Sequence, residues 1–116
     1  MGTKETKIFT RIVGEIQSNP AIMRYARPGW CRMWSALAKD LITVASLPDC
    51  NATIQALETD VLPGFSHTFL KVTINNTESY IMDGTGVEDH PPFFGPVQET
   101  PDHLKNSRVD IMLNSY

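Results

Sequence analysis

Residues 67–86 read HTFLKVTINNTESYIMDGTG, and this stretch carries the clearest structural pattern of the chain. Between positions 67 and 74 the side chains alternate in a way that is typical of a β-strand with two different faces. One face carries Thr68, Leu70, Val72 and Ile74, and the other carries His67, Phe69, Lys71 and Thr73. Asn75-Asn76-Thr77 is a turn signal, and residues 79–83 form the returning strand. The stretch therefore predicts an antiparallel β-hairpin.

Two helices are expected before this hairpin. Residues 5–17 place apolar side chains at helical spacing and end at Ser18-Asn19-Pro20. After the loop signal Arg27-Pro28-Gly29, residues 31–45 carry a stronger apolar stripe. Leu47-Pro48-Asp49 ends this second helix, because proline disfavours a helical residue before it.

The rest of the chain has weaker patterns. Residues 53–57 predict a strand, and Pro63-Gly64 predicts a turn. The last thirty residues are rich in proline and are expected to wrap irregularly over the core, with an edge strand or a short helix at 109–113. Within them, Pro91-Pro92-Phe93-Phe94-Gly95 is either a substrate lid or a hydrophobic plug, and the rarity of large exposed apolar patches favours the plug.

Composition limits the class of protein. The chain has 116 residues, of which 41% are hydrophobic and 20% charged, as expected for one globular domain that covers 1–116. A net charge of -3 without a basic run argues against nucleic acid as a partner. No apolar stretch approaches the ~18 residues of a membrane span, and the start MGTKETKIFT lacks the apolar core of a signal peptide. Two cysteines, Cys31 and Cys50, indicate a cytoplasmic protein with free thiols.

Cys31, His67 and Asp83 are the residues whose chemistry fits a thiol site. Cys31 opens the second helix after a Gly29-Trp30 turn, where unpaired N–H groups and the helix dipole lower the pKa of a thiol. His67 begins one hairpin strand and Asp83 ends the other. With a three-residue loop at 74–76, His67 stands directly opposite Asp83, at a Cβ separation of about 4.5–5.5 Å. The set then supplies a nucleophile, a base and a group that orients the base.

These residues also carry a resemblance to a known family. Gly29-Trp30-Cys31 at a helix start, His67-Thr-Phe-Leu-Lys-Val72 on one strand and Tyr80-Ile-Met-Asp83-Gly-Thr85 on the next resemble the transglutaminase-like superfamily of papain-like folds. The resemblance covers residues 29–85. It implies an α+β fold in which N-terminal helices precede a Cys-bearing helix packed on a small antiparallel β-sheet. It also implies that Cys31 is the nucleophile, His67 the base and Asp83 the orienting carboxylate.

The sequence departs from the family pattern around the cysteine. Arg32 stands where family members often have a small residue, and no glutamine shortly before Cys31 offers a donor to an oxyanion. The backbone N–H of Cys31 can serve as one donor, with Asn19 or Tyr25 as the side chain that adds a second. Trp30 either walls the substrate cleft or packs beneath it.

No metal or cofactor is predicted. His90 and His103 each follow an aspartate in the proline-rich tail, but adjacent Asp-His pairs lack the spacing of a zinc site. Gly84-Thr85-Gly86 follows a strand without the further glycine and the helix that a dinucleotide site needs.

The sequence thus predicts a small hydrolase that cleaves amide or acyl bonds through a thioacyl intermediate, as a protease, amidase or deamidase. The substrate is a peptide, a protein or a small amide. Two alternatives stay open. One is a transferase that uses an amine as acceptor, and the other is a non-catalytic binding module or complex subunit with the same fold. The length also permits a homodimer, although no surface is specified for one.

Overall fold

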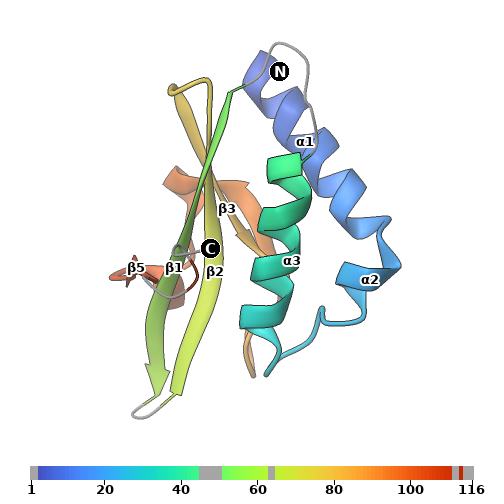
Figure 1. Cartoon of the computed structure of the whole chain (residues 1–116). Helices are drawn as coiled ribbons and strands as arrows, with labels where there is room; N and C mark the ends of the chain where they lie inside the picture. The colour runs from blue at the N-terminus through green and yellow to red at the C-terminus, as the bar shows by residue number, and fades with distance from the viewer. Residues whose placement is uncertain (1–2, 45–50, 63–64, 111–112, 114–116) are drawn as a thin grey trace.

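The computed structural model describes residues 3–44, 51–62, 65–110 and 113. Its architecture is α+β, with the N-terminal helices on one side of a five-stranded antiparallel sheet of order β4-β3-β2-β1-β5 (Figure 1). The elements in chain order are α1 (Lys4–Gln17), α2 (Pro20–Met23), α3 (Cys31–Val44), β1 (Ala52–Leu62), β2 (Phe65–Ile74), β3 (Glu78–Asp83), β4 (Phe93–Pro96), the 3-10 turns η1 (Val97–Glu99) and η2 (Asp102–Leu104), and β5 (Arg108–Val109). None of the helices in the described ranges has the length and apolar character needed to cross a membrane.

The two long helices match the expected ones. The Thr3 side chain accepts a hydrogen bond from the Thr6 N–H and so caps α1, a common role of threonine at this position. The helix α3 begins at Cys31, as expected, and buries Trp34, Ala38 and Ile42 at four-residue spacing against the sheet. The expected helix end near 45, the stop signal at 47–49, the turn at 63–64 and Cys50 all lie outside the described residues.

The β2–β3 hairpin is confirmed, but its expected register is wrong by two residues. Leu70 pairs with Met82 rather than Tyr80, and Ile74 pairs with Glu78 across a three-residue loop. The loop begins one residue later than expected because Asn75 and Asn76 both take left-handed conformations, at φ 54° and 58°, which asparagine tolerates well. A shift of two residues keeps every side chain on its predicted face, because the side-chain period of a strand is two.

The strand β1 is longer than expected, and it pairs with β2 from Ala52 to Leu62. The sequence did not indicate the second half of this strand, because Glu58, Thr59 and Asp60 are polar. In the structure the carboxylates of Glu58 and Asp60 pair with arginines, so these polar residues do not end the strand.

The sheet separates two apolar clusters. The larger one lies between the helices and the facing strand residues, which include Leu70, Val72, Ile74, Tyr80 and Met82. The smaller one lies on the other face and consists of Leu57, Phe69, Ile81 and Leu104, with Phe93 and Val97 packed against it. The C-terminal segment covers this second face, as expected, and it contributes two short strands.

The strand β4 was not expected, since Pro91 and Pro92 precede it directly. It pairs with β3 and sends Phe94 toward the helix-side cluster and Phe93 toward the other. Both rings are partly buried against these clusters, which agrees with the plug rather than the lid. Of the segment 109–113, expected to be an edge strand or a short helix, Val109 belongs to the two-residue strand β5 and Leu113 is helical, whereas residues 111–112 lie outside the described residues.

Candidate active site

The thiol of Cys31 sits at the first position of α3. Gly29, at φ +96°, turns the chain, and the Trp34 N–H donates to the Trp30 carbonyl at 3.0 Å to close the first helical turn. The sulfur accepts the backbone N–H of Thr68 at 3.4 Å. Burial alone raises the pKa of the Cys31 thiol, but hydrogen bonds from His67 and from backbone N–H groups, together with the charge of His67, outweigh it, so the pKa is lowered.

A gap in the sheet ladder explains why the thiol lies there. The strand β3 ends at Asp83, so the backbone of Thr68 in β2 has no strand partner on that side. The Thr68 N–H donates to Cys31 Sγ instead, and the Thr68 carbonyl accepts from Ser35 Oγ at 3.5 Å. Cys31 and Ser35 are four residues apart on one helix face, so α3 satisfies both backbone groups that the missing strand would have paired.

His67 lies between the thiol and Asp83. The ring is 2% exposed, stacks on Phe69 with 6.0 Å between ring centroids, and places Nε2 3.0 Å from Asp83 Oδ1. The ring N–H does not point squarely at that oxygen, although Asp83 Oδ1 is close enough to hold the ring in place. With Nε2 committed to Asp83, Nδ1 is the nitrogen left for the thiol of Cys31, which is within hydrogen-bonding reach of the ring.

The charge of His67 is strongly stabilised. Burial by itself lowers the pKa of the imidazole, but the interactions with Asp83 and Cys31 exceed this effect and raise the pKa to about 9. The lowered thiol pKa and the raised imidazole pKa both favour the thiolate–imidazolium pair over the neutral pair. A thiolate of this kind is the reactive form of cysteine.

Asp83 is held from the loop that follows it. The carboxylate is 1% exposed, and its Oδ1 accepts the backbone N–H groups of Thr85 at 3.3 Å and Gly86 at 3.0 Å. Gly86 has a φ of +66°, and a Cβ there would stand 2.6 Å from the His90 carbonyl. The expectation that His67 stands directly opposite Asp83 is wrong. In the observed register the two residues are diagonal neighbours on one face, which long side chains still bridge.

The other residues named for the site lie on the chain that leads into α3. Trp30 is exposed, and its ring centroid is 5.3 Å from that of Tyr25. The side-chain oxygen of Asn19 accepts the Ala21 N–H and caps α2. The roles of Asn19 and Tyr25 as oxyanion donors stay predictions.

Arg32 lies next to the candidate site, and the sequence indicated it only as an unusual residue beside the cysteine. Its guanidinium reaches Glu58 at 3.0 Å and Asp110 at 2.9 Å, and the Asp110 carboxylate is 2% exposed. The beginning of α3 is thereby tied to β1 and to the C-terminal segment. Residues 58 and 110 lie far from 32 in the sequence, so no local pattern could have indicated this pairing.

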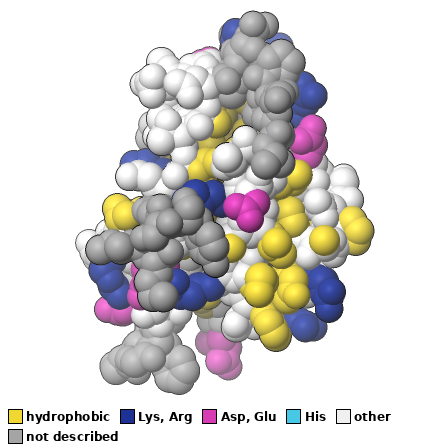
Figure 2. All heavy atoms as spheres, viewed as in Figure 1, with side chains coloured by type: hydrophobic (Ala, Val, Ile, Leu, Met, Phe, Trp, Pro, Cys, Tyr) yellow, Lys and Arg dark blue, Asp and Glu magenta, His cyan; other side chains and the backbone are white. Residues whose placement is uncertain are grey.

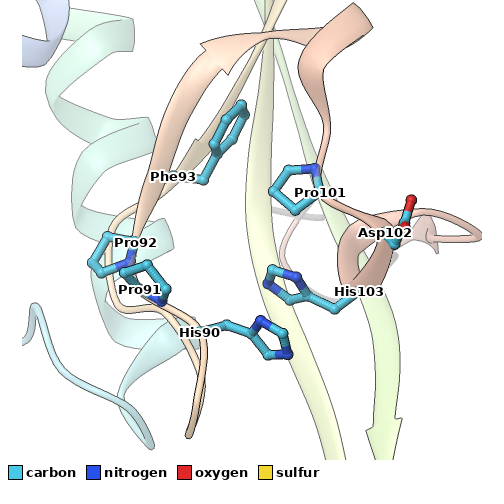
Figure 3. A pocket seen from close by; sticks show the side chains of 7 residues that line it. All are labelled: His90, Pro91, Pro92, Phe93, Pro101, Asp102 and His103. Atoms are coloured by element: carbon cyan, nitrogen blue, oxygen red, sulfur yellow. The ribbon is translucent and has the colours of Figure 1, made fainter.

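A pocket of about 350 Å³ lies at the beginning of β4. It is lined by His90, Pro91, Pro92, Phe93, Pro101, Asp102 and His103. The His90 and His103 rings are stacked at 3.9 Å between their centroids, and Figure 3 shows them next to each other. Burial and the neighbouring His90 lower the pKa of His103. Among the described residues, no group of three or more His, Cys, Asp or Glu could hold a metal ion.

Comparisons with protein-family models, with curated proteins and with solved structures found no match to this chain.

Proposed function

We propose that the protein is a thiol hydrolase that cleaves an amide or acyl bond with Cys31, His67 and Asp83. One observation carries the proposal. Three residues from a helix start and two strand ends form a continuous chain of contacts, in which a thiol of lowered pKa meets an imidazole that Asp83 holds at 3.0 Å. A nucleophile, a base and an orienting group in contact are the signature of covalent acyl transfer.

The reaction begins with the Cys31 thiolate attacking the substrate carbonyl. A C–S bond forms, the carbonyl becomes an oxyanion, and His67 gives its Nδ1 proton to the leaving amine as the C–N bond breaks. In the second half, His67 takes a proton from water, the water oxygen attacks the thioester, and the C–S bond breaks to release the acid. Asp83 keeps Nε2 protonated and stabilises the imidazolium throughout.

The oxyanion needs N–H donors. The backbone N–H of Cys31 belongs to the first helical residue, so it has no partner within α3 and is available to the developing charge. Tyr25 or Asn19 would add the second donor.

The architecture is compatible with the resemblance to the transglutaminase-like superfamily. A Cys-bearing helix packs on an antiparallel sheet that carries a histidine and an aspartate, and the chain order is Cys, His, Asp. On those grounds we propose that the chain has the papain-like arrangement of this superfamily. Small members of the superfamily are more often hydrolases than cross-linkers, so water is the proposed acceptor and an amine the alternative. A reduced thiol is required, which fits the cytoplasm.

The first experiment measures how fast Cys31 reacts with iodoacetamide between pH 5 and pH 10, with mass spectrometry separating its modification from that of Cys50. The wild type should react at pH 6, well below the ~8.5 of an ordinary thiol. The His67→Ala variant should be at least tenfold slower at that pH, whereas a His90→Ala control should match the wild type.

Slow reaction of the wild type, with a midpoint near that of an ordinary thiol, would reject the enzyme and favour the non-catalytic binding module. If the thiol is activated, screening with fluorogenic amides follows. In that screen the Cys31→Ala variant must be inactive.

A further inference from the structure

The surface around the beginning of α3 is unusually apolar. Four large hydrophobic side chains are exposed among the described residues, and three of them, Met23, Trp30 and Met33, lie within ten positions around Cys31 at 38%, 44% and 43% exposure. Figure 2 shows hydrophobic side chains gathered over α2 and the beginning of α3, with Lys and Arg side chains beside them. Exposed apolar groups gathered in this way mark an interaction site more often than isolated ones do.

Two arginines belong to the same surface. The Arg24 guanidinium lies 5.2 Å from the centroid of the Tyr25 ring, and the Arg27 guanidinium lies 5.8 Å from that of Trp30. The Tyr25 and Trp30 rings are themselves in contact, so cations and aromatic faces alternate along it. No carboxylate of the described residues pairs with either arginine, although the whole chain carries a net charge of -3.

We propose that this surface, formed by Met23, Arg24, Tyr25, Arg27, Trp30 and Met33, binds the polypeptide substrate and selects a segment in which an apolar side chain is flanked by acidic ones. The inference rests on the proposed function and specifies its substrate class. Trp30 directly precedes Cys31 in the chain, so a segment held at its ring lies at the beginning of α3, the end of the helix that carries the thiol. The exposed rings and methionines take the apolar side chain, and the two unpaired guanidinium groups take the carboxylates.

Other occupants fit less well. Anionic lipid surfaces are usually recognised by clusters of about four to eight cations, and this surface offers two. Three side chains that are about two-fifths exposed provide roughly 250 Å² of apolar area, well below the ~800 Å² per partner of a stable dimer. An extended peptide needs neither feature, because it binds through a few anchoring side chains.

The test uses fluorescein-labelled peptides of seven residues on the Cys31→Ala protein. The three peptides share a central phenylalanine, which is flanked by two glutamates, two glutamines or two lysines. Fluorescence anisotropy should show the glutamate peptide binding about three- to tenfold tighter than the glutamine peptide at 50 mM NaCl, with most of the difference lost at 300 mM. The lysine peptide should bind weakest.

Variants locate the binding. The double variant Arg24→Gln/Arg27→Gln should bind the glutamate and glutamine peptides equally, and Trp30→Ala should weaken all three. Arg11→Gln is the matched control, because Arg11 is an exposed arginine on α1 that pairs only with Glu15 among the described residues, and it should keep the preference. A preference that persists in the double variant would overturn the proposal, as would equal affinities in the parent protein.

Two further outcomes separate the proposals. Binding to vesicles with 30% phosphatidylserine without any peptide preference would assign the surface to membranes, and dimerisation lost in Trp30→Ala would assign it to a second copy. Each would overturn the inference. An activated Cys31 without peptide preference would reject this surface and keep the enzyme. Peptide preference beside an ordinary thiol would reject the enzyme and leave a peptide-binding surface.

Discussion

The Gly84→Ala substitution should destabilise the fold and the site together. A Cβ at this position would stand 1.9 Å from Trp34 Cε2 and 2.0 Å from Cζ2, whereas carbon atoms in contact stay about 3.5–4.0 Å apart. The loop or the indole must therefore move by roughly 1.5–2 Å. The φ of Gly84 lies outside the left-handed region, so the effect is steric and not conformational.

Neither partner can move freely. Trp34 is 1% exposed and meets the edge of Phe94 at 6.1 Å between ring centroids. Gly84 directly follows Asp83, whose carboxylate contacts His67. It precedes the backbone N–H groups that donate hydrogen bonds to the same carboxylate. Overpacking a rigid core costs about 1–3 kcal/mol and occasionally more, and we expect about 3 kcal/mol here. For a domain near 100 residues this lowers the Tm by roughly 12–20 °C.

Thermal unfolding followed by circular dichroism measures the loss of stability. Gly14→Ala is the matched control, because nothing lies within 4 Å of its added Cβ and it sits inside α1, so it should stabilise by about 0.5–1 kcal/mol. In the double variant Gly84→Ala/Trp34→Phe, the smaller ring should restore part of the loss caused by the first substitution. A Gly84→Ala protein with the Tm of the wild type would refute the steric argument, and so would additive losses in the double variant.

Three further predictions concern the charges. Asp83→Asn removes the carboxylate that raises the pKa of His67, so an NMR titration of the ring should show its pKa falling from about 9 toward 6.5; an unchanged value would contradict the assignment of Asp83. In Cys31→Ser, the free energy of unfolding should stay constant below pH 6.5 and fall by about 1–3 kcal/mol as the pH rises to 9, because folded His67 keeps a proton that the unfolded chain loses. Urea titrations across this pH range would test the prediction, and a free energy of unfolding that rises with pH would refute it. Arg32→Gln leaves the buried Asp110 carboxylate without its cation and should lower the free energy of unfolding in urea by about 2 kcal/mol. The double variant Arg32→Gln/Asp110→Asn should recover part of this stability, and a loss that the second substitution does not reduce would argue against the ion pair.

The local sequence pattern was sufficient to predict the elements that carry the candidate site. Strand alternation around His67 and the helix that opens at Cys31 were both readable because each depends on neighbours in the sequence. The register of the hairpin could not be predicted in this way, because two asparagines accept left-handed conformations at either of two loop positions. The contact between Asp83 and His67 is nevertheless present, since the two side chains are diagonal neighbours on one face and still reach each other.

Features that depend on distant residues could not be predicted. The polar run Glu58-Thr59-Asp60 looked like a strand end, yet the arginines that neutralise it come from positions 32 and 108. The strand β4 follows two prolines, and only its pairing with β3 makes it a strand. The hydrogen bonds between α3 and the Thr68 backbone replace those of a missing strand partner, and no sequence pattern indicates them.

The short loop at residues 75–77 has a consequence for insertions and deletions. It begins eight residues after His67, roughly 26 Å along the strand. Yet its length determines which residue of β3 reaches the imidazole. A change in its length that slips β3 by one residue along β2 would turn Asp83 to the face that carries Tyr80 and Met82. A surface turn, normally the most tolerant place for changes of length, is thus expected to keep a fixed length in this chain.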